Sequence, residues 1–129
     1  MKHLLSFLLG SLLLANIAYS DAFSETEGAT LYKMICASCH MPDGKGAEGA
    51  GTYPSFVNNA KIENKSYPQI VVLYGLNGMP AFGGVLDNSQ ISNVINYVRT
   101  NFGGYQDGPI TAEEVAMLRI PDYEYNDLN

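Results

Sequence analysis

The sequence predicts a small all-α domain of three to five helices, and three observations support this fold class. Apolar side chains recur at helical spacing, most clearly over residues 91–98. Glycine and proline are concentrated in residues 41–59 and 77–84, which we interpret as irregular loops, and no convincing pair of strands is present. The chain has 129 residues, which suffices for one domain and leaves no room for a second.

The first 20 residues have the composition of a secretory signal peptide. Lys2 precedes an apolar stretch from Leu4 to Leu14, and small residues follow before Ser20. We expect cleavage after Ser20, with Ala22 as the alternative, and therefore an exported, periplasmic protein. The apolar stretch is short for a membrane span, which needs roughly 20 residues. We expect no span in the mature chain, and an uncleaved N-terminal anchor is the competing interpretation.

A first helix is predicted over residues 25–39. The apolar positions between Leu31 and Ile35 fall at helical spacing, and Thr26 or Ser24 can cap the start.

A second, short helix is predicted over residues 67–75. Pro68 suits a first helical position and Gly75 suits a C-terminal cap. The β-branched run from Ile70 to Val72 could equally form a buried strand, because periodicity does not separate the two over so few residues. The end signals favour a helix.

The clearest helix follows Ser89, which can cap it, and ends by Gly103. We therefore place the main domain at residues 21–102 and a C-terminal extension at residues 103–129.

The extension is expected to contain one short helix. Thr111 and Glu114 have capping-box spacing, and Pro121 ends the segment. The acidic residues 122–129 are expected to be extended or mobile.

The motif that carries chemistry is Cys36-Ala37-Ser38-Cys39-His40. Two thiols at this spacing can form thioethers with the vinyl groups of haem, and His40 can then bind the iron as the proximal ligand. A thioredoxin-like redox pair, a structural zinc site and a plain disulfide are the alternatives. They fit less well, because the flanks lack a βαβ pattern, only two cysteines are present, and a disulfide does not require the adjacent histidine.

The second axial ligand is predicted by elimination. His40 is the only histidine left after removal of residues 1–20, so the ligand must be a methionine, a weaker group, or nothing. Met34 lies in the helix that leads to the motif, and Met41 is bonded to His40 and cannot reach the opposite face. Met117 lies in the late helix, where methionine is commonly core filler.

Met79 remains and is the candidate sixth ligand. A ligand loop needs a backbone that can approach the porphyrin closely, which Gly78 permits, and a stiff support, which Pro80 provides. The alternative for Met79 is that it fills the core.

These features together resemble the class I c-type cytochromes. The resemblance spans residues 25 to about 102 and includes Gly28 and Tyr32 in the first helix, the Cys-x-x-Cys-His motif, the Met-Pro loop, and Tyr97 in the late helix. It implies the small cytochrome c fold, wrapped around one covalently bound haem c with its iron.

The resemblance also implies two contacts. Gly28 should let the first helix cross the last one closely near Tyr97, and the Pro54 carbonyl should accept a hydrogen bond from His40. An ordinary turn is the alternative role for Pro54.

The extension is similar to the C-terminal stretch of cytochrome subunits that serve periplasmic dehydrogenases. This implies redox partner proteins, with a dehydrogenase as electron donor and a cytochrome or oxidase as acceptor. A helix that only covers one side of the haem domain explains the same residues equally well.

Charge excludes one class of partner. Removal of Lys2 with the first 20 residues leaves six basic and thirteen acidic side chains, so the formal net charge changes from −6 to −7. Nucleic acid binding needs basic patches, so we expect no nucleic acid partner. A protein partner with a basic docking face is more plausible.

His40 and Met79 together would fill both axial positions of the iron. The expected function is therefore electron transfer, as a carrier or as a dehydrogenase subunit, and not catalysis. If Met79 does not bind the iron, a haem enzyme or a small-ligand sensor is the alternative.

Overall fold

The structure is a computed structural model that describes residues 24–125. The signal peptide predicted for residues 1–20 and the end of the extension, residues 126–129, lie outside this range. The described elements follow in chain order: α1 (Gly28–Leu31), the π-helical segment η1 (Tyr32–Cys36), α2 (Ala37–His40), β1 (Ala47–Glu48), β2 (Thr52–Tyr53), the 3-10 segment η2 (Ala60–Ile62), α3 (Ser66–Tyr74), α4 (Asn88–Asn101) and α5 (Ala112–Leu118).

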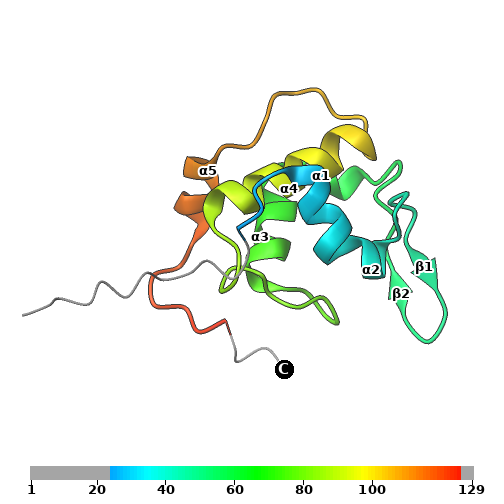
Figure 1. Ribbon diagram of the computed structural model, residues 1–129, viewed down its shortest axis with the longest axis horizontal. Coiled ribbons are helices and arrows are strands. Elements are labelled where there is room, and N and C mark those ends of the chain that lie inside the picture. The colour runs from blue at the N-terminus through cyan, green and yellow to red at the C-terminus, as the bar shows by residue number, and fades with distance from the viewer. Residues whose placement is uncertain (1–23, 126–129) are drawn as a thin grey trace, which may run out of the picture.

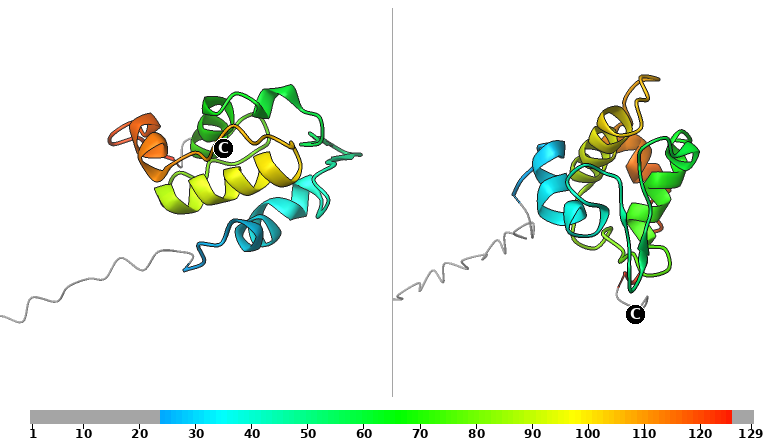
Figure 2. Two further views of the ribbon diagram at one scale, coloured as in Figure 1. Left: turned by 90° about the horizontal axis from the view of Figure 1, so that it is seen from above. Right: turned by 90° about the vertical axis from the view of Figure 1, so that its right-hand side faces the viewer.

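The all-α prediction is confirmed, and α4 is the centre of the arrangement (Figure 1). Seen from above, α4 lies between the stretch α1–η1–α2 on one side and α3 on the other (Figure 2). The helix α5 packs beside the start of α4, and the β1–β2 hairpin projects from the opposite end (Figures 1 and 2). Within residues 24–125 the helices are too short or too polar to span a lipid bilayer.

The first helical stretch begins and bends differently from the prediction. Its N-cap is Glu27, whose carboxylate accepts from the backbone N–H groups of Ala29 and Thr30, and neither Thr26 nor Ser24 takes that role. The middle of the stretch, η1, has the wider turn of a π-helix, a feature that is frequent at functional sites. The stretch runs to His40, so the predicted helix does lead into the motif.

Gly28 lies where α1 crosses α4. A Cβ atom at this position would lie 2.9 Å from the backbone carbon of Asn93, which is closer than real Cβ contacts, and 3.1 Å from Tyr97 Cβ, which is a tight contact. Two hydrogen bonds from side chains of α4 to the backbone just before α1 hold this crossing. Gln90 Nε2 donates to the Glu25 carbonyl at 2.7 Å and Asn93 Nδ2 donates to the Thr26 carbonyl at 2.8 Å. The close crossing implied by the resemblance is therefore present.

The expectation that the chain contains no strand pair is wrong. β1 and β2 form a short antiparallel hairpin, in which Ala47 is opposite Tyr53 and Glu48 is opposite Thr52. Two residues per strand are too few to show an alternating pattern, and the surrounding glycines hide the signal further. The hairpin lies within the predicted loop 41–59, whose remaining residues are irregular.

The helix predicted over residues 67–75 is confirmed as α3, and the strand alternative is excluded. It starts at Ser66, so Pro68 is the third residue of the helix and not the first. Proline is still tolerated there, because the N–H groups of the first helical turn have no acceptor within the helix. Gly75 ends α3 with a φ of 76°, in agreement with the predicted cap.

Capping boxes start both later helices. At α4 the cap is Asp87 with Gln90, not Ser89, because the Asp87 carboxylate accepts from the Gln90 N–H at 2.7 Å. At α5 the predicted box is confirmed: Glu114 N–H donates to Thr111 Oγ1 at 3.2 Å, and Thr111 N–H donates to the Glu114 carboxylate at 2.7 Å.

The irregular segment between α4 and α5 is fastened to α4 by two polar side chains. Arg99, which is only 1% exposed, donates from its Nη2 atom to both oxygens of the Asp107 carboxylate, at 2.8 and 2.9 Å. Asn96 satisfies both backbone groups of Ile110, since its Oδ1 accepts from the Ile110 N–H and its Nδ2 donates to the Ile110 carbonyl, each at 2.8 Å. Ile110 is thereby buried in the core.

The core is formed by apolar side chains from each helical layer, including the extension. Its buried members are Leu31, Tyr32, Ile62, Leu73, Leu86, Ile91, Val94, Ile95, Val98, Ile110 and Val115. The predicted apolar face of α4 supplies four of them. Because Ile110 and Val115 come from the extension, residues 103–118 are part of the folded domain and do not form a separate tail.

We predict that Gly28→Ala destabilises the fold by separating α1 from α4. The added Cβ must displace backbone atoms of Asn93, and such overpacking typically costs about 1–3 kcal/mol of unfolding free energy. Chemical denaturation of both proteins measures the difference. Gly49→Ala is the matched control, because a Cβ at Gly49 has no atom within 4 Å; equal stabilities of the two variants would contradict the close crossing.

Candidate haem site

The two cysteines lie on the last turns of the first helical stretch, where η1 passes into α2. Cys36 and Cys39 are both free and partly buried. Burial raises the pKa of the Cys36 thiol to about 11, and the neighbouring Cys39 adds to this rise. Redox-active Cys-x-x-Cys pairs have lowered thiol pKa values, so this environment does not suit a thioredoxin-like function.

His40 is buried at the C-terminus of α2 and is held by the loop that follows. Its Nδ1 atom lies 3.1 Å from the carbonyl oxygen of Pro54. A carbonyl oxygen only accepts hydrogen bonds, so Nδ1 carries the proton and Nε2 of the neutral ring keeps a free lone pair. Burial lowers the pKa of His40, although the bond to Pro54 raises it in part, so the neutral form that a metal requires is favoured.

Aromatic side chains fix the plane of the His40 ring and the end of its helix. Phe56 stacks on the imidazole with ring centres 4.4 Å apart and planes 28° apart. The hydroxyl of the buried Tyr32 donates to the Met41 carbonyl at 2.6 Å. Met41 has φ 64° and ψ 153°, a conformation that only glycine adopts easily, so this contact holds a strained residue directly after His40.

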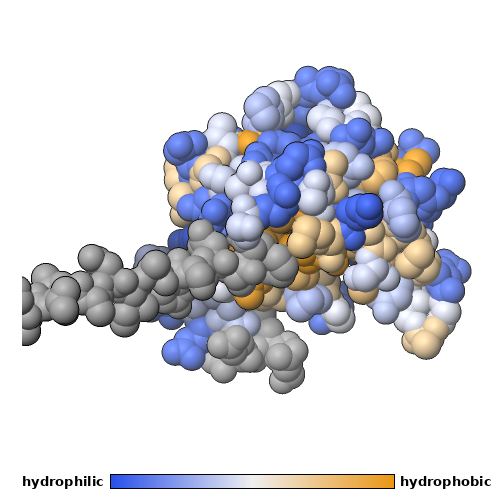
Figure 3. Space-filling view, viewed as in Figure 1, coloured by the Kyte–Doolittle hydropathy of each residue, from blue (hydrophilic) through white to orange (hydrophobic). Residues whose placement is uncertain are grey.

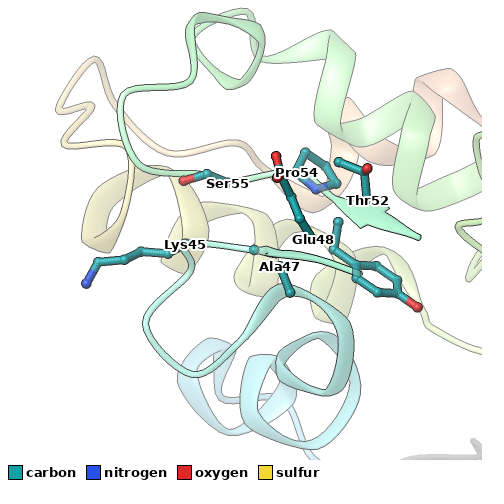
Figure 4. A pocket seen from close by; sticks show the side chains of 8 residues that line it. Lys45, Ala47, Glu48, Thr52, Pro54 and Ser55 are labelled. Atoms are coloured by element: carbon teal, nitrogen blue, oxygen red, sulfur yellow. The ribbon is translucent and has the colours of Figure 1, made fainter. Parts of the chain in front are cut away.

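Gly46 lets the Pro54 carbonyl come within reach of His40. It has φ 69°, its N–H donates to the His40 carbonyl at 3.1 Å, and a Cβ atom on it would lie 2.9 Å from the Pro54 oxygen. An open cavity of about 440 Å³ lies beside this contact and is lined by both hairpin strands, with Lys45 and Ser55 together at one end (Figure 4). The hairpin, which the sequence did not predict, thus connects Gly46 to Pro54, the two residues that position the imidazole of His40.

Met79 lies on a loop that folds back on itself after α3. We call residues 75–82 the Met79 loop. Leu76 and Met79 exchange two backbone hydrogen bonds, at 3.1 and 3.0 Å. Gly75 permits this turn, because a Cβ on it would lie 2.6 Å from the Met79 carbonyl oxygen. The positive φ within the turn belongs to Asn77, at 53°.

Two of the other methionines, Met34 and Met117, are more exposed than Met79. Met34 is 56% exposed and Met117 is 77% exposed, so the expectation that Met117 fills the core is wrong. Met41 is partly buried beside His40. Met79 is partly buried on a loop separate from the motif.

The residues present fit a haem group. Two free thiols three residues apart precede a neutral, oriented imidazole, which is the donor set for covalent attachment and proximal ligation. Partly buried apolar side chains pack against the core on both the motif side and the Met79 side: Ile35, Ala37, Phe56, Val72 and Phe82. Apolar side chains also gather between α2 and the loop after α3 in the space-filling view (Figure 3).

Several supporting residues could not be identified from the sequence. Phe56 and Gly46 stand in the glycine-rich loop without any periodic pattern, so only a resemblance could have indicated their role. Tyr74, the last residue of α3, donates its hydroxyl proton to the Leu118 carbonyl and accepts from the Ile120 N–H, contacts that no local sequence pattern indicates.

Comparison with known proteins gives the family. The profile of the family described as cytochrome C oxidase, cbb3-type, subunit III, matches residues 24–98. The chain is 36% identical over 109 residues to the fructose dehydrogenase cytochrome subunit of Gluconobacter japonicus, and this match covers 73% of the chain and 22% of that protein. It is 29% identical over 118 residues to the cytochrome c subunit of the quinone alcohol dehydrogenase of Gluconacetobacter polyoxogenes, covering 81% and 25%.

A shorter relative matches along most of its length. The chain is 32% identical over 134 residues to cytochrome c-552 of Thermus thermophilus, covering 87% of the chain and 84% of that protein. The chain therefore spans about a quarter of the dehydrogenase subunits that it matches, but most of cytochrome c-552. From the matched profile and this relative, the chain belongs to the cbb3-type subunit III family of class I c-type cytochromes, which carry haem c and transfer electrons.

Proposed function

We propose that the protein is a periplasmic single-electron carrier with one haem c, attached through Cys36 and Cys39 and ligated by His40 and Met79. The haem supplies reversible exchange of one electron between the ferric and ferrous states of its iron. The observation that carries the proposal is the buried, neutral His40, whose Nδ1 lies 3.1 Å from the Pro54 carbonyl and whose Nε2 is free to bind iron.

The proximal residues set how strongly His40 donates to the iron. A hydrogen bond from Nδ1–H to a carbonyl fixes the ring and increases its basicity, as partners of ligating histidines commonly do. Stacking on Phe56 adds a second restraint on rotation of the ring. A rigid ligand requires little rearrangement when the electron arrives or leaves.

Met79 is proposed as the sixth ligand because its loop is folded, is separate from the motif, and offers a thioether. A methionine opposite a histidine raises the reduction potential and blocks access to the iron, which suits transfer and not ligand chemistry. An open haem enzyme or sensor is the outcome if Met79 does not bind.

The partners proposed are a dehydrogenase that donates electrons and a cytochrome or oxidase that accepts them. Several of the similar proteins are named as cytochrome subunits of fructose, alcohol or gluconate dehydrogenases. The negative net charge favours a partner with a basic docking face. Transient redox encounters bury little surface, so no large apolar interface is needed.

Met79→Ala tests the ligand set. We expect the variant to lose the weak near-infrared sulfur-to-iron band of the ferric protein, to bind carbon monoxide rapidly when ferrous, and to have a lower reduction potential. Met117→Ala, a change at a methionine that is 77% exposed, should leave all three unchanged. A wild-type protein without the band that binds carbon monoxide rapidly would instead identify an open haem site.

Gly46→Ala tests the proximal contact. The added Cβ must push the Pro54 carbonyl away from His40, so His40 becomes a weaker donor, the ferric state loses stabilisation, and the reduction potential rises. Spectroelectrochemical titration measures the potential. Gly51→Ala, where a Cβ has no neighbour within 4 Å, should leave the potential unchanged, and an unchanged potential in Gly46→Ala would argue against a role for the contact.

Export predicts a processed N-terminus. Protein recovered from the periplasmic fraction of a cell that matures c-type cytochromes should begin at Asp21, or at Phe23 if cleavage follows Ala22. Intact mass measurement should show this start together with the mass of one haem. Full-length protein retained in the membrane fraction would identify an uncleaved anchor.

A further inference from the structure

The C-terminal extension makes a second set of contacts that the electron-transfer function does not explain. Residues 118–125, which we call the clasp segment, leave α5 and return along the end of α3 (Figure 1). There they meet both ends of the Met79 loop, at Tyr74 before it and at Gly83 after it.

Two backbone hydrogen bonds close the base of the Met79 loop. Phe82 N–H donates to the Val72 carbonyl at 2.8 Å, and Gly83 N–H donates to the Leu73 carbonyl at 3.1 Å. These two bonds bring the end of the loop back onto α3. The conformation of residues 72–83 therefore decides where the side chain of Met79 can reach.

Arg119 holds the chain that leaves the loop. Its guanidinium donates to the Gly83 carbonyl at 2.6 Å, to the Leu86 carbonyl at 2.7 Å, and to Asn88 Oδ1 at the start of α4. A single cation thus joins three successive points of the chain after the loop. Such hydrogen bonds from a charged donor are among the stronger ones in proteins.

Tyr74 holds the chain that enters the loop. Its hydroxyl accepts from the Ile120 N–H at 2.8 Å and donates to the Leu118 carbonyl. Its ring packs against Tyr123, with centres 4.8 Å apart, and against Tyr125 at 5.9 Å. The clasp segment is therefore bound to the last residue of α3 by both its backbone and its aromatic side chains.

Tyr125 also covers the residue that follows the loop. A Cβ atom at Gly83 would lie 2.6 Å from Tyr125 Cζ, so the tyrosine ring rests directly on the glycine backbone. The Tyr125 hydroxyl accepts a hydrogen bond from Arg119 at 3.2 Å. As far as Tyr125, the residues beyond Pro121, which the sequence predicts to be extended or mobile, pack against the domain.

We propose that the clasp segment keeps Met79 on the iron, and that Arg119 and Tyr74 are positioning residues for this ligand. This inference rests on the proposed function, because it requires Met79 to be the sixth ligand. By restraining both ends of the loop, the clasp segment disfavours the loop conformations in which the thioether has left the iron. An external ligand can bind only when those conformations are populated, so its apparent affinity reports on the restraint.

The experiment is a titration of the ferric holoprotein with imidazole, which competes with Met79. For Arg119→Gln we expect imidazole to bind about 5- to 150-fold more tightly than to the wild type, the usual range for coupling between two sites. The control is Arg99→Gln. Arg99 is also an arginine that binds backbone carbonyls and one side chain, but its partners Ile62, Glu63 and Asp107 lie outside residues 72–88. We expect this control to lose unfolding stability with no change in imidazole affinity.

A second pair of variants removes only hydroxyl groups, in case Arg119→Gln does not fold. Tyr74→Phe should also tighten imidazole binding, because it frees the Ile120 N–H and keeps the aromatic contacts. Tyr105→Phe is the control, since its hydroxyl donates to the Asn59 carbonyl at 3.3 Å, away from the loop. It should bind imidazole as the wild type does.

The outcomes separate the two proposals. Wild-type affinity in both Arg119→Gln and Tyr74→Phe, with the near-infrared band present, overturns the clasp and leaves Met79 ligation standing. Equal tightening in the Arg99 and Arg119 variants also overturns it, because the effect would then follow from general instability. A wild-type protein that lacks the band and binds imidazole as tightly as Met79→Ala overturns the ligand assignment itself.

Discussion

The hydrogen bond between His40 and the Pro54 carbonyl connects the end of the first helical stretch to a loop that has no helix of its own. The loop must therefore be brought back over the imidazole, and the short hairpin, the positive φ of Gly46 and the stacking of Phe56 all serve that return. The strained Met41 begins the same turn and is held by Tyr32. Without this bond the imidazole could rotate more freely, and Nε2 of His40 would not point in a fixed direction.

Much of the fold follows from local signals that act over a few residues. Helical spacing identified α4, the end signals at Gly75 identified α3, and the box of Thr111 and Glu114 identified α5, because each signal concerns neighbours within one or two turns. Caps were less secure. Asp87 and Ser89 are both able to cap α4. With Asp87 as the cap, the Gln90 side chain accepts from the Asp87 N–H and also donates to the Glu25 carbonyl, and this second partner is far away in the sequence.

The site could be predicted only in part, for a physical reason. The motif at Cys36 and Cys39 is specific, because cysteines at this spacing followed by a histidine are typical of haem attachment. The adjacent His40 is then the candidate proximal ligand. The supports of the site come from distant parts of the chain and have no pattern of their own. Tyr74 and Arg119 are 45 positions apart, and Arg119 gives no sequence signal that distinguishes it from an ordinary surface arginine.

The exchange of two hydrogen bonds between Asn96 and the backbone of Ile110 has a consequence for how the chain can vary. One side chain here replaces a strand partner, and with the Arg99–Asp107 ion pair it anchors the chain leading to α5 at two points and not along a surface. Gly108 and Pro109, which are exposed between the two anchors, are therefore the place where this connection can gain or lose residues without moving α5. A change of length there leaves the contacts of Phe102 and Tyr105 with the core intact.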